Sequence, residues 1–355
     1  MITLSRITCA AVAAFALVGC AGGTSKSGKL TVGFVSNNAA AWWNIAKAGA
    51  RKAESELSLD VQFRKPNPGN ASTQKENVQN VLNTGAKAVA VSVIDPKNQT
   101  DYLDEIAEKV PLLAVDNDAP RSKRLAYIGT DNYAAGKAVG KLVKEALGEK
   151  GGTVAIFVGQ LDALNARQRR QGVIDELLGR EPPQDLNDFK TSPDGEAKGV
   201  WKLHAKTYTD QPEGQKRAQE NAEDFLGKLP EGNVCLVGLW AYNPPACLAA
   251  LEKVKDDAVR ARVKIVGFDE DPATLDAIEK GIVHGTVVQD PFEFGYQSVK
   301  LMAALAKGDK NKLPKDGLVH IPYRIIQKAD GDADGLKRLA VGPFRKKLEE
   351  LMGKK

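Results

Sequence analysis

The sequence predicts an α/β protein built from two doubly wound domains, each a parallel sheet with helices on both faces. Short apolar segments alternate with segments of helical periodicity along most of the 355 residues. The strand segments are apolar throughout, which is typical of parallel strands buried on both faces. About ten strand–helix units are too many for one open sheet, and two sheets accommodate them better.

Strands are expected where short apolar runs stand between polar residues. The first such run occupies 29–36, and the run at 153–158 is almost wholly apolar. The remaining strands are expected at 61–63, 88–93, 112–115, 125–128, 203–208, 234–239, 263–268 and 285–288.

Helical periodicity predicts helices at 42–57, 72–82, 99–109, 132–147 and 163–178, and a short amphipathic helix at 344–352. Further helices are expected to begin near Gln211, Pro244, Pro272 and Pro291. Proline suits the first helical turn, where an amide hydrogen would lack a partner. The segment 181–198 is rich in Pro, Asp and Gly, and we expect it to be a surface insertion.

The composition is that of an ordinary globular protein, with 43% apolar and 27% charged residues. The formal net charge of +5 is spread along the chain, which argues against a nucleic-acid partner. The three histidines lie far apart and no C-x-x-C pair occurs, so we expect no metal site. An acidic run from Asp330 lacks the glutamate that a calcium loop carries at its twelfth position, where Val341 stands. We expect no cofactor.

The first residues form a targeting segment. Arg6 is the only charge before Lys26, and the stretch 7–18 is mostly apolar but too short to span a bilayer. It leads into Leu17-Val18-Gly19-Cys20, which resembles a bacterial lipobox. An ordinary secretory signal that ends in a chance cysteine is the alternative. We expect a lipoprotein signal peptide at 1–19, lipid attachment at Cys20, a flexible tether at 20–28, and a membrane-anchored protein in the periplasm or at the cell surface.

Beyond Cys20, the mature chain would retain two cysteines. Cys235 lies in a predicted strand and Cys247 in the helix that follows. An oxidising compartment permits a single disulfide between them. Two buried thiols are the alternative, and the sequence does not decide between the two.

Familiar catalytic signatures do not occur in the sequence. It contains no G-x-G-x-x-G after a strand, no Walker lysine motif, no G-x-S-x-G elbow and no H-E-x-x-H pair. Carboxylates are frequent, but spacing alone does not pair an acid with a base. We therefore expect a binding protein and not an enzyme.

Polar and aromatic residues gather at the carboxyl ends of the predicted strands, where open parallel sheets bind ligands. Carboxylates and amides can pair with vicinal hydroxyls, and aromatic faces can cover the apolar face of a sugar ring. These residue types therefore favour a sugar pocket. The candidates are Asn38, Trp42, Trp43, Asp95, Asp116, Arg167, Asn243, Asp269 and Gln289.

Several candidates also have a purely structural interpretation. Asp95 precedes Pro96 and Asn243 precedes Pro244, so each can cap a helix instead of meeting a ligand. Arg167 belongs to an arginine-rich run of the kind that forms a solvated helix face. One of the two adjacent tryptophans is expected in the core, because neighbouring helical residues point in different directions.

Three local motifs carry a resemblance to a known family. They are Val266-Gly267-Phe268-Asp269 followed by Pro272, Thr286 to Pro291 followed by Gly295, and Asp131-Asn132 followed by Gly136-Lys137. Over about 30–323, their order and spacing resemble the type I periplasmic sugar-binding proteins, the ribose- and galactose-binding group of ABC-importer receptors.

The resemblance implies two similar domains joined by three crossing segments, with a sugar between them and a hinge that closes on it. The first domain would comprise 29–130 and 291–320, and the second 131–290 and 321–355. The chain would capture a monosaccharide or related polyol as a monomer and deliver it to an ABC transporter permease. A sugar-sensing receptor that signals to a membrane sensor protein is the alternative.

The resemblance also implies roles for the candidates of the first domain. Trp42 and Trp43 stand where the family has an aromatic pair, one ring of which stacks on the sugar. Asn38 stands near an asparagine of that domain, and Asp116 matches the carboxylate that binds two ring hydroxyls. Asp95 falls where relatives often have asparagine.

In the second domain, the resemblance implies that Arg167 reaches hydroxyls and the ring oxygen of the sugar. Asn243 and Asp269 match an amide and a carboxylate of that domain, and Gln289 matches a glutamine of the last crossing strand. Asn117 replaces an arginine seen in ribose binders, which argues against ribose itself as the ligand.

Overall fold

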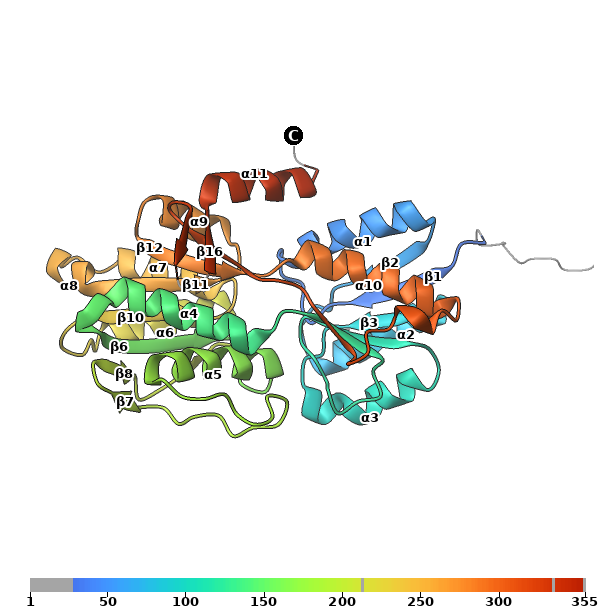
Figure 1. Ribbon diagram of the computed structural model, residues 1–355, viewed down its shortest axis with the longest axis horizontal. Helices are drawn as coiled ribbons and strands as arrows, with labels where there is room; N and C mark the ends of the chain where they lie inside the picture. The colour runs from blue at the N-terminus through green and yellow to red at the C-terminus, as the bar shows by residue number, and fades with distance from the viewer. Residues whose placement is uncertain (1–27, 212–213, 334–335, 354–355) are drawn as a thin grey trace, which may run out of the picture.

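The computed structural model describes residues 28–211, 214–333 and 336–353 of the chain. Its strands form two separate sheets, and each sheet with its helices makes one of two lobes that lie end to end (Figure 1). The prediction of two doubly wound, mostly parallel sheets is thereby confirmed. The expected signal peptide, Cys20 and nearly all of the expected tether lie outside the described residues. Among the described helices, none combines the length and the apolar character needed to cross a membrane.

The first lobe contains a six-stranded sheet of β1 (Thr31–Val35), β2 (Asp60–Arg64), β3 (Val89–Val91), β4 (Leu112–Val115), β5 (Ala126–Gly129) and β13 (Leu318–His320). The strand order is β13-β5-β4-β3-β1-β2, and all neighbours are parallel. The chain moves from β1 first to β2 and then back past β1 to β3. The direction of winding therefore reverses between β1 and β3, where open sheets form a ligand-binding crevice.

Helices cover both faces of this sheet, namely α1 (Trp43–Leu57), α2 (Ala71–Asn83), α3 (Pro96–Ala107) and α10 (Pro291–Ala306). Phe34 of β1 is buried in a cluster with α1 and α10. The next residue, Val35, is buried on the opposite face with α2 and α3. Successive strand residues alternate between faces, so a sheet covered on both sides needs strands that are apolar throughout.

The second lobe contains a ten-stranded sheet of β6 (Gly152–Val158), β7 (Ala197–Lys198), β8 (Trp201–Leu203), β9 (Tyr208–Thr209), β10 (Val234–Gly238), β11 (Val263–Phe268), β12 (Val283–Val288), β14 (Arg324–Gln327), β15 (Gly331–Ala333) and β16 (Leu336–Ala340). Its order is β15-β16-β14-β12-β11-β10-β6-β8-β7, and β9 also pairs with β6. The four central strands, β6, β10, β11 and β12, are parallel to one another, whereas β14 runs antiparallel to β12.

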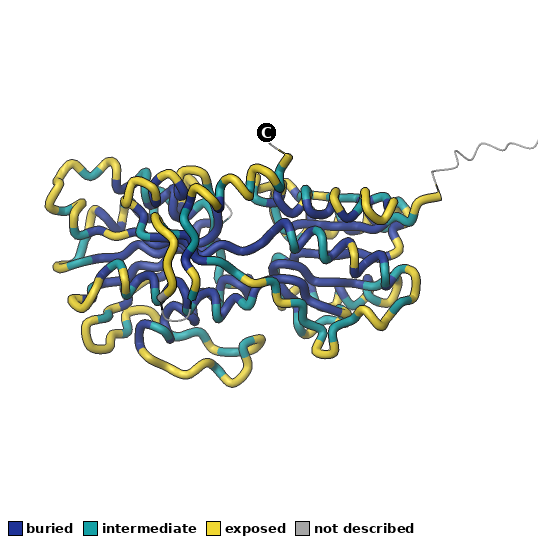
Figure 2. Tube along the Cα trace, turned by 45° about the horizontal axis from the view of Figure 1, so that its top comes forward, coloured by how far each residue is buried: buried dark blue, intermediate teal, exposed yellow. Residues whose placement is uncertain are grey.

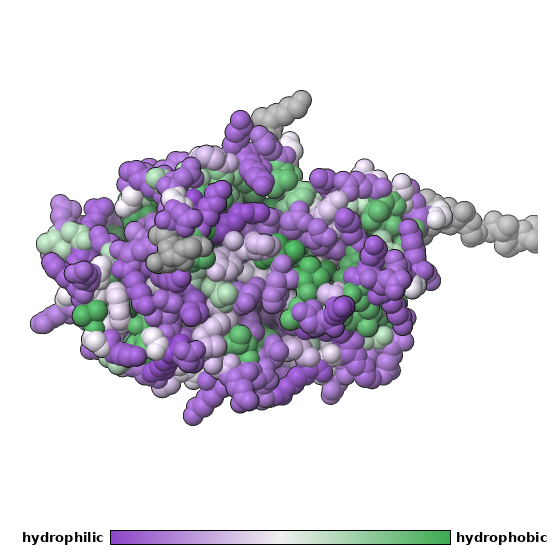
Figure 3. Space-filling view, in the orientation of Figure 1, coloured by the Kyte–Doolittle hydropathy of each residue, from purple (hydrophilic) through white to green (hydrophobic). Residues whose placement is uncertain are grey.

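Helices again cover both faces. On one face, α4 (Asn132–Leu147) and α5 (Leu164–Leu178) share a buried cluster with Val154 of β6. On the other face, Ala155 is buried with α6 (Gln215–Leu226), α7 (Asn243–Glu252), α9 (Pro272–Glu279) and α11 (Val341–Leu351). The short helices α8 (Asp257–Arg262), η1 (Gly148–Lys150) and η2 (Lys310–Lys312) complete the elements. Figure 2 shows the buried strands enclosed by more exposed helices and loops, and the face in Figure 3 is mostly hydrophilic.

The chain passes between the two sheets three times (Figure 1). The first passage leads from β5 to α4, the second from β12 to α10, and the third from β13 to β14. These passages occupy 130–131, 289–290 and 321–323. The division of the chain into two domains at the expected boundaries remains a prediction.

The structure differs from the sequence prediction after the insertion at 181–198. The prediction of one strand at 203–208 is wrong, because β8 and β9 are separate. Asp194 of the insertion accepts hydrogen bonds from the backbone N–H of Thr207 at 3.0 Å and from its hydroxyl at 2.6 Å. The backbone N–H of Thr207, which a continuous strand would donate to β6, is therefore bonded to Asp194 instead.

Two glycines let α1 and α10 touch backbone to backbone. A Cβ atom at Gly49 of α1 would lie 1.9 Å from a carbonyl oxygen of α10, and one at Gly295 of α10 would lie 1.9 Å from a carbonyl oxygen of α1. Only glycine fits at such a distance. The arrangement recurs in the second lobe, where Gly136 of α4 and Gly172 of α5 lie against the backbone of the facing helix.

We predict that Gly295→Ala lowers the free energy of unfolding by about 3 kcal/mol, because the added methyl group forces α1 and α10 apart. Urea unfolding followed by circular dichroism measures the change. Gly342→Ala in α11 is the matched control, since its added Cβ would meet no described atom within 4 Å apart from the neighbouring backbone of its own helix. We expect that control to lose no stability. A Gly295→Ala protein as stable as the wild type would contradict the close packing.

Candidate functional site

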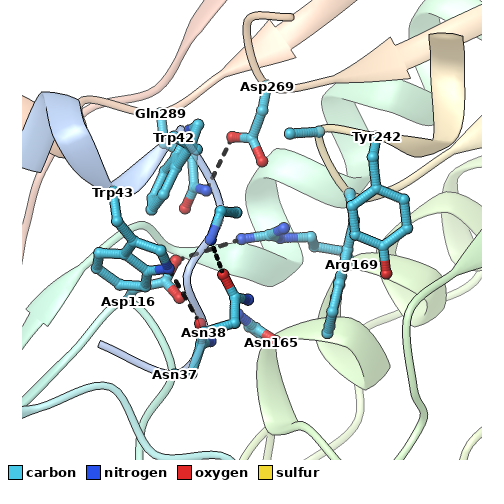
Figure 4. A pocket seen from close by; sticks show the side chains of 13 residues that line it. Asn37, Asn38, Trp42, Trp43, Asp116, Asn165, Arg169, Tyr242, Asp269 and Gln289 are labelled. Atoms are coloured by element: carbon cyan, nitrogen blue, oxygen red, sulfur yellow. Dashed lines mark hydrogen bonds and ion pairs between the residues drawn. The ribbon is translucent and has the colours of Figure 1, made fainter. Parts of the chain in front are cut away.

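A cavity lies between the two lobes, and residues of both line it (Figure 4). About 450 Å³ of space between its walls, part of it open to solvent, is not filled by atoms. The lining residues are Asn37, Asn38, Ala40, Trp42, Trp43, Asp116, Asn165, Arg169, Trp240, Ala241, Tyr242, Asp269 and Gln289.

The cavity forms where the carboxyl ends of parallel strands from both sheets face each other. On the first lobe, β1 leads toward Asn37 and Asn38, and β4 ends immediately before Asp116. On the second lobe, β11 ends immediately before Asp269 and β12 immediately before Gln289. The sheet topology therefore positions the site.

Asp116 and Asp269 occupy equivalent turns in the two lobes. Their φ angles are 61° and 65°, in the left-handed region that residues other than glycine rarely adopt. Each backbone N–H donates to the neighbouring strand, that of Asp116 to Ile128 at 3.0 Å and that of Asp269 to Val287 at 2.7 Å. Strained backbone of this kind is concentrated at functional sites. The repeated turn therefore supports a functional role for this pair of carboxylates.

Arg169 lies on α5 and is 2% exposed. Its Nε donates to Oδ1 of Asn132 at 2.8 Å, and Nη1 donates to the carbonyl oxygen of Leu239 at 3.1 Å. The guanidinium carbon lies 4.0 Å from the centre of the Phe268 ring. Nη2 has no hydrogen-bond partner among the described residues and lies 3.9 Å from Oδ1 of Asp116. The arginine is thus held firmly while one donor nitrogen remains available to a ligand.

Neutral side chains hold both carboxylates in place. Gln289 donates from Nε2 to Oδ1 of Asp269 at 2.9 Å, and Ser92 donates to Oδ2 of Asp116 at 3.2 Å. These bonds fix the orientation of both carboxylates. They also leave acceptor capacity on each of them, because a carboxylate has about four lone-pair sites.

Several other buried polar atoms around the cavity have no hydrogen-bond partner in the described part of the chain. Buried polar groups are normally paired, so each such atom needs an explanation. The unpaired donors are Nε1 of Trp42 and Nε1 of Trp240, and the unpaired acceptors are Oδ1 of Asn165 and Oε1 of Gln289. A ligand with many hydroxyl groups would pair with these donors and these acceptors.

Burial raises the pKa of both cavity carboxyl groups. For Asp116, burial outweighs the opposing effects of the Arg169 charge and of hydrogen bonds from Ser92 and Gln289. For Asp269, burial raises the pKa to about 6, although Arg169 and Gln289 lower it. The two ionised carboxylates are therefore costly in the ligand-free protein, and hydroxyl donors would relieve part of that cost.

Three tryptophans, two from the first lobe and one from the second, line the cavity. Trp43 is almost fully buried, meets Phe34 edge-on at 6.1 Å and donates from Nε1 to Asn37. Trp42 stands at 88° to Trp43 and is only partly buried. Trp240 comes from the loop after β10 on the other lobe. The expectation that one of the adjacent tryptophans belongs to the core therefore applies to Trp43, which still forms part of the cavity wall.

The structure brings most of the sequence-predicted site residues to this cavity, and their contact with a ligand remains a prediction. Those that line the cavity are Asn38, Trp42, Trp43, Asp116, Asp269 and Gln289.

Arg167 does not line the cavity, and its predicted place belongs to Arg169. Two residues along a helix correspond to a rotation of about 200°, so the two arginines of α5 point to nearly opposite sides. Arg167 lines a separate hollow, and its guanidinium carbon lies 5.8 Å from the centre of the Phe189 ring in the insertion. The rotation along α5 therefore explains why Arg169, and not Arg167, lines the cavity.

Asp95 and Asn243 also lie outside the cavity lining, and both act on the backbone instead. Asp95 caps α3, accepting from the backbone N–H of Asn98 at 3.2 Å. Asn243 is fully buried and accepts from the N–H of Trp240 at 2.9 Å, while its Nδ2 donates to Asp210 at 2.7 Å. Asn243 thus fixes the loop that carries Trp240.

Sequence reasoning did not select Asn37, Asn165, Arg169, Trp240 and Tyr242, which also line the cavity. The spacing of Asn165 and Arg169 was the available signal. Residues four apart lie on the same face of a helix, so these two point in one direction while Arg167 does not.

Cys235 on β10 and Cys247 on α7 are free and fully buried. Burial raises the pKa of both thiols. Of the two alternatives left open by the sequence, the structure has the pair of buried thiols.

Comparison with known proteins agrees with this architecture. A family model described as "Periplasmic binding protein domain" matches residues 32–310. The D-allose-binding periplasmic protein of Escherichia coli is 23% identical over 294 residues, which cover 78% of this chain and 86% of that protein. The ribose import binding protein RbsB of Salmonella typhimurium is 23% identical over 265 residues, covering 74% of this chain and 80% of that protein.

Among solved structures, the glucose-galactose binding protein GanP of Geobacillus stearothermophilus superposes with a TM-score of 0.71 at 25% identity, covering 85% of this chain and 98% of GanP. These relatives are non-catalytic binding proteins, which confirms the expectation that the chain is not an enzyme. Since the family model spans most of the described residues, the chain belongs to the periplasmic binding protein domain family.

Proposed function

We propose that this protein captures a monosaccharide or closely related polyol in the interlobe cavity and delivers it to an ABC transporter permease. The observation that carries the proposal is the cavity wall itself. It combines unpaired buried donors and acceptors with indole rings from opposite lobes. A small molecule with hydroxyl groups around its rim and apolar C–H faces matches that wall.

Each side chain has a defined part in this binding mode. Asp116 and Asp269 accept hydrogen bonds from ligand hydroxyls, because each retains free lone pairs. Arg169 donates from Nη2 to a hydroxyl or to the ring oxygen. Trp42 and Trp240 cover the C–H faces of the ring. A micromolar affinity corresponds to about −8 kcal/mol, which a few charge-assisted hydrogen bonds and a stacked ring can supply.

The charge balance of the cavity favours a neutral ligand. Among the described lining residues, the charged side chains are the two carboxylates and one guanidinium. A phosphate or carboxylate on the ligand would add to an existing negative excess in a buried site, where repulsion is strong. Sugar phosphates and sugar acids are therefore disfavoured. The relatives named for allose, ribose, glucose and galactose support the choice of neutral sugars.

The proposed mechanism is capture by hinge closure. The open form admits the sugar, the lobes close about the three crossing segments, and the closed form docks on the permease. We place the protein in the periplasm or at the cell surface, anchored by lipid on Cys20. The alternative partner, a membrane sensor protein, would read the same closed form.

We predict that at least one neutral sugar or polyol raises the midpoint of thermal unfolding. A ligand at about 100 times its Kd adds about 2.7 kcal/mol of stability. Differential scanning fluorimetry against pentoses, hexoses, deoxy sugars, polyols, nucleosides, sugar phosphates and sugar acids provides the measurement. A response confined to sugar phosphates or acids would contradict the charge argument, and no response at all would contradict sugar binding.

We predict that Arg169→Ala weakens binding of the identified sugar by at least about 100-fold, because two buried carboxylates lose their counter-charge. Isothermal titration calorimetry measures the loss, and circular dichroism verifies that the variant is folded. Arg167→Ala is the matched control on the same helix, for which we expect a change below about threefold. Equal losses in the two variants would rule out the assignment of the cavity arginine.

We predict that Asp269→Asn abolishes binding yet stabilises the ligand-free protein at pH 7.5 by about 1–2 kcal/mol. Folding raises the pKa of this carboxyl from its ordinary 3.8 to about 6, so its ionisation at neutral pH costs free energy only in the folded state. The wild type recovers that cost as the pH falls through 6 toward 4, because the folded protein then binds a proton. The advantage of the variant should shrink over the same window.

Urea unfolding of both proteins at pH 7.5 and pH 4.5 measures this difference. An Asp269→Asn protein that is less stable than the wild type at pH 7.5 would show that Arg169 and Gln289 more than compensate the buried charge. Asparagine suits the left-handed backbone at this position, so strain does not complicate the comparison.

A further inference from the structure

Asn117 joins the two lobes at the edge of the cavity. It follows Asp116 in the first lobe and is 1% exposed. Its Oδ1 accepts a hydrogen bond of 3.0 Å from the backbone N–H of Asn165 in the second lobe. This bond therefore crosses the cleft and involves no ligand atom.

The side chain of Asn117 is held rigidly on its own lobe. Its Nδ2 donates to the carbonyl oxygen of Val93, and the N–H of Val93 donates back to the Asn117 carbonyl at 3.1 Å. The Asn117 N–H donates to the carbonyl oxygen of Val115 at 2.7 Å, so the three remaining polar groups of the residue are engaged within the first lobe. Oδ1 is left to point at the second lobe in a fixed direction.

Oδ1 of Asn117 contacts the N-terminus of α5, a helix that has no side-chain cap of its own. The N-cap position of α5 is Ala163, whose side chain cannot accept a hydrogen bond. Helices α1, α6, α7 and α11 also lack a side-chain cap, whereas α2, α3, α4, α9 and α10 each begin with an Asn or Asp whose side chain accepts from the first turn. The first amides of a helix need such partners. Within the described chain, α5 receives its cap from the opposite lobe.

We infer that Asn117 is a latch that caps α5 across the cleft and stabilises the closed form of the protein. The inference rests on the proposed capture by hinge closure. Opening the lobes would leave both the Asn165 amide and the Asn117 oxygen without this bond. The same helix carries Arg169 one turn further on, so the latch also fixes the arginine relative to Asp116.

Other contacts between the lobes are weaker candidates for this role. Arg121 pairs with Asp188 of the insertion, but the two side chains are 69% and 61% exposed. Exposed ion pairs contribute little, because water screens them. Gln160 donates to the carbonyl oxygen of Ile94 at 3.3 Å from a partly exposed position. The buried Asn117 bond is shorter and lies against a helix N-terminus.

The first test is Asn117→Ala. We expect the dissociation rate of every sugar that binds to rise by the same factor, about tenfold, because Asn117 does not line the sugar cavity. Stopped-flow tryptophan fluorescence measures the rate. We also expect small-angle scattering to show a larger radius of gyration for the ligand-free variant than for the wild type. Arg121→Ala is the control from the exposed ion pair, and it should change neither quantity.

A second pair of variants removes the donor instead of the acceptor. Asn165→Pro and Asn165→Ala both lose the side chain, but only proline also loses the backbone N–H, and proline is tolerated in a first helical turn. We expect Asn165→Pro to be less compact than Asn165→Ala and to release sugar about tenfold faster. Adding Asn117→Ala to Asn165→Pro should then have no further effect.

The scattering comparison separates the latch from the sugar-binding proposal. If no sugar binds the wild type, the proposed function fails, while the radii of the ligand-free proteins still decide the latch. Equal radii for the wild type, Asn117→Ala and Asn165→Pro would overturn it. So would Asn165→Pro and Asn165→Ala proteins with the same radius.

Discussion

Arg169 is the side chain on which the geometry of the cavity depends. It is the counter-charge for two buried carboxylates that come from opposite lobes, and burying three charges is costly unless each is oriented by hydrogen bonds. Its bonds to Asn132 and Leu239 and its contact with the Phe268 ring use three separate segments of the second lobe. The position of the guanidinium is therefore fixed by the fold before any ligand arrives, and its charge acts on both buried carboxylates.

The groups around the cavity also lie on or beside the segments that join the lobes. Asn132, which orients Arg169, directly follows the first crossing, and Gln289, which orients Asp269, stands in the second. A change in the angle between the lobes must therefore move the hydrogen-bonding groups of the site. Conversely, a ligand that pairs with these groups favours one angle, which is how binding and closure become one event.

Periodicity predicted most elements because the sheets are covered on both faces, and α4 at 132–147 and β11 at 263–268 have the expected bounds. It did not find the short strands β13 to β16, which lack an apolar run of their own. The strand-end rule selected Asp116, Asp269 and Gln289 because the backbone dictates where a strand ends. It could not set the phase of α5, on which the choice between Arg167 and Arg169 depends, nor separate a helix cap such as Asp95 from a ligand-binding group.

The turns at Asp116 and Asp269 have the same left-handed backbone conformation, but the residue that follows the aspartate has a different role in each lobe. In the first lobe, the residue after the aspartate is Asn117, which reaches α5 across the cleft. In the second lobe it is Glu270, whose carboxyl oxygens are buried with no hydrogen-bond partner in the described chain. Burial, and then the charges of Asp269 and Asp290, raise the pKa of Glu270 against the opposing effect of Arg324. Ionising Glu270 is therefore costly in the folded protein, and this turn disfavours a further negative charge beside the two carboxylates that Arg169 offsets.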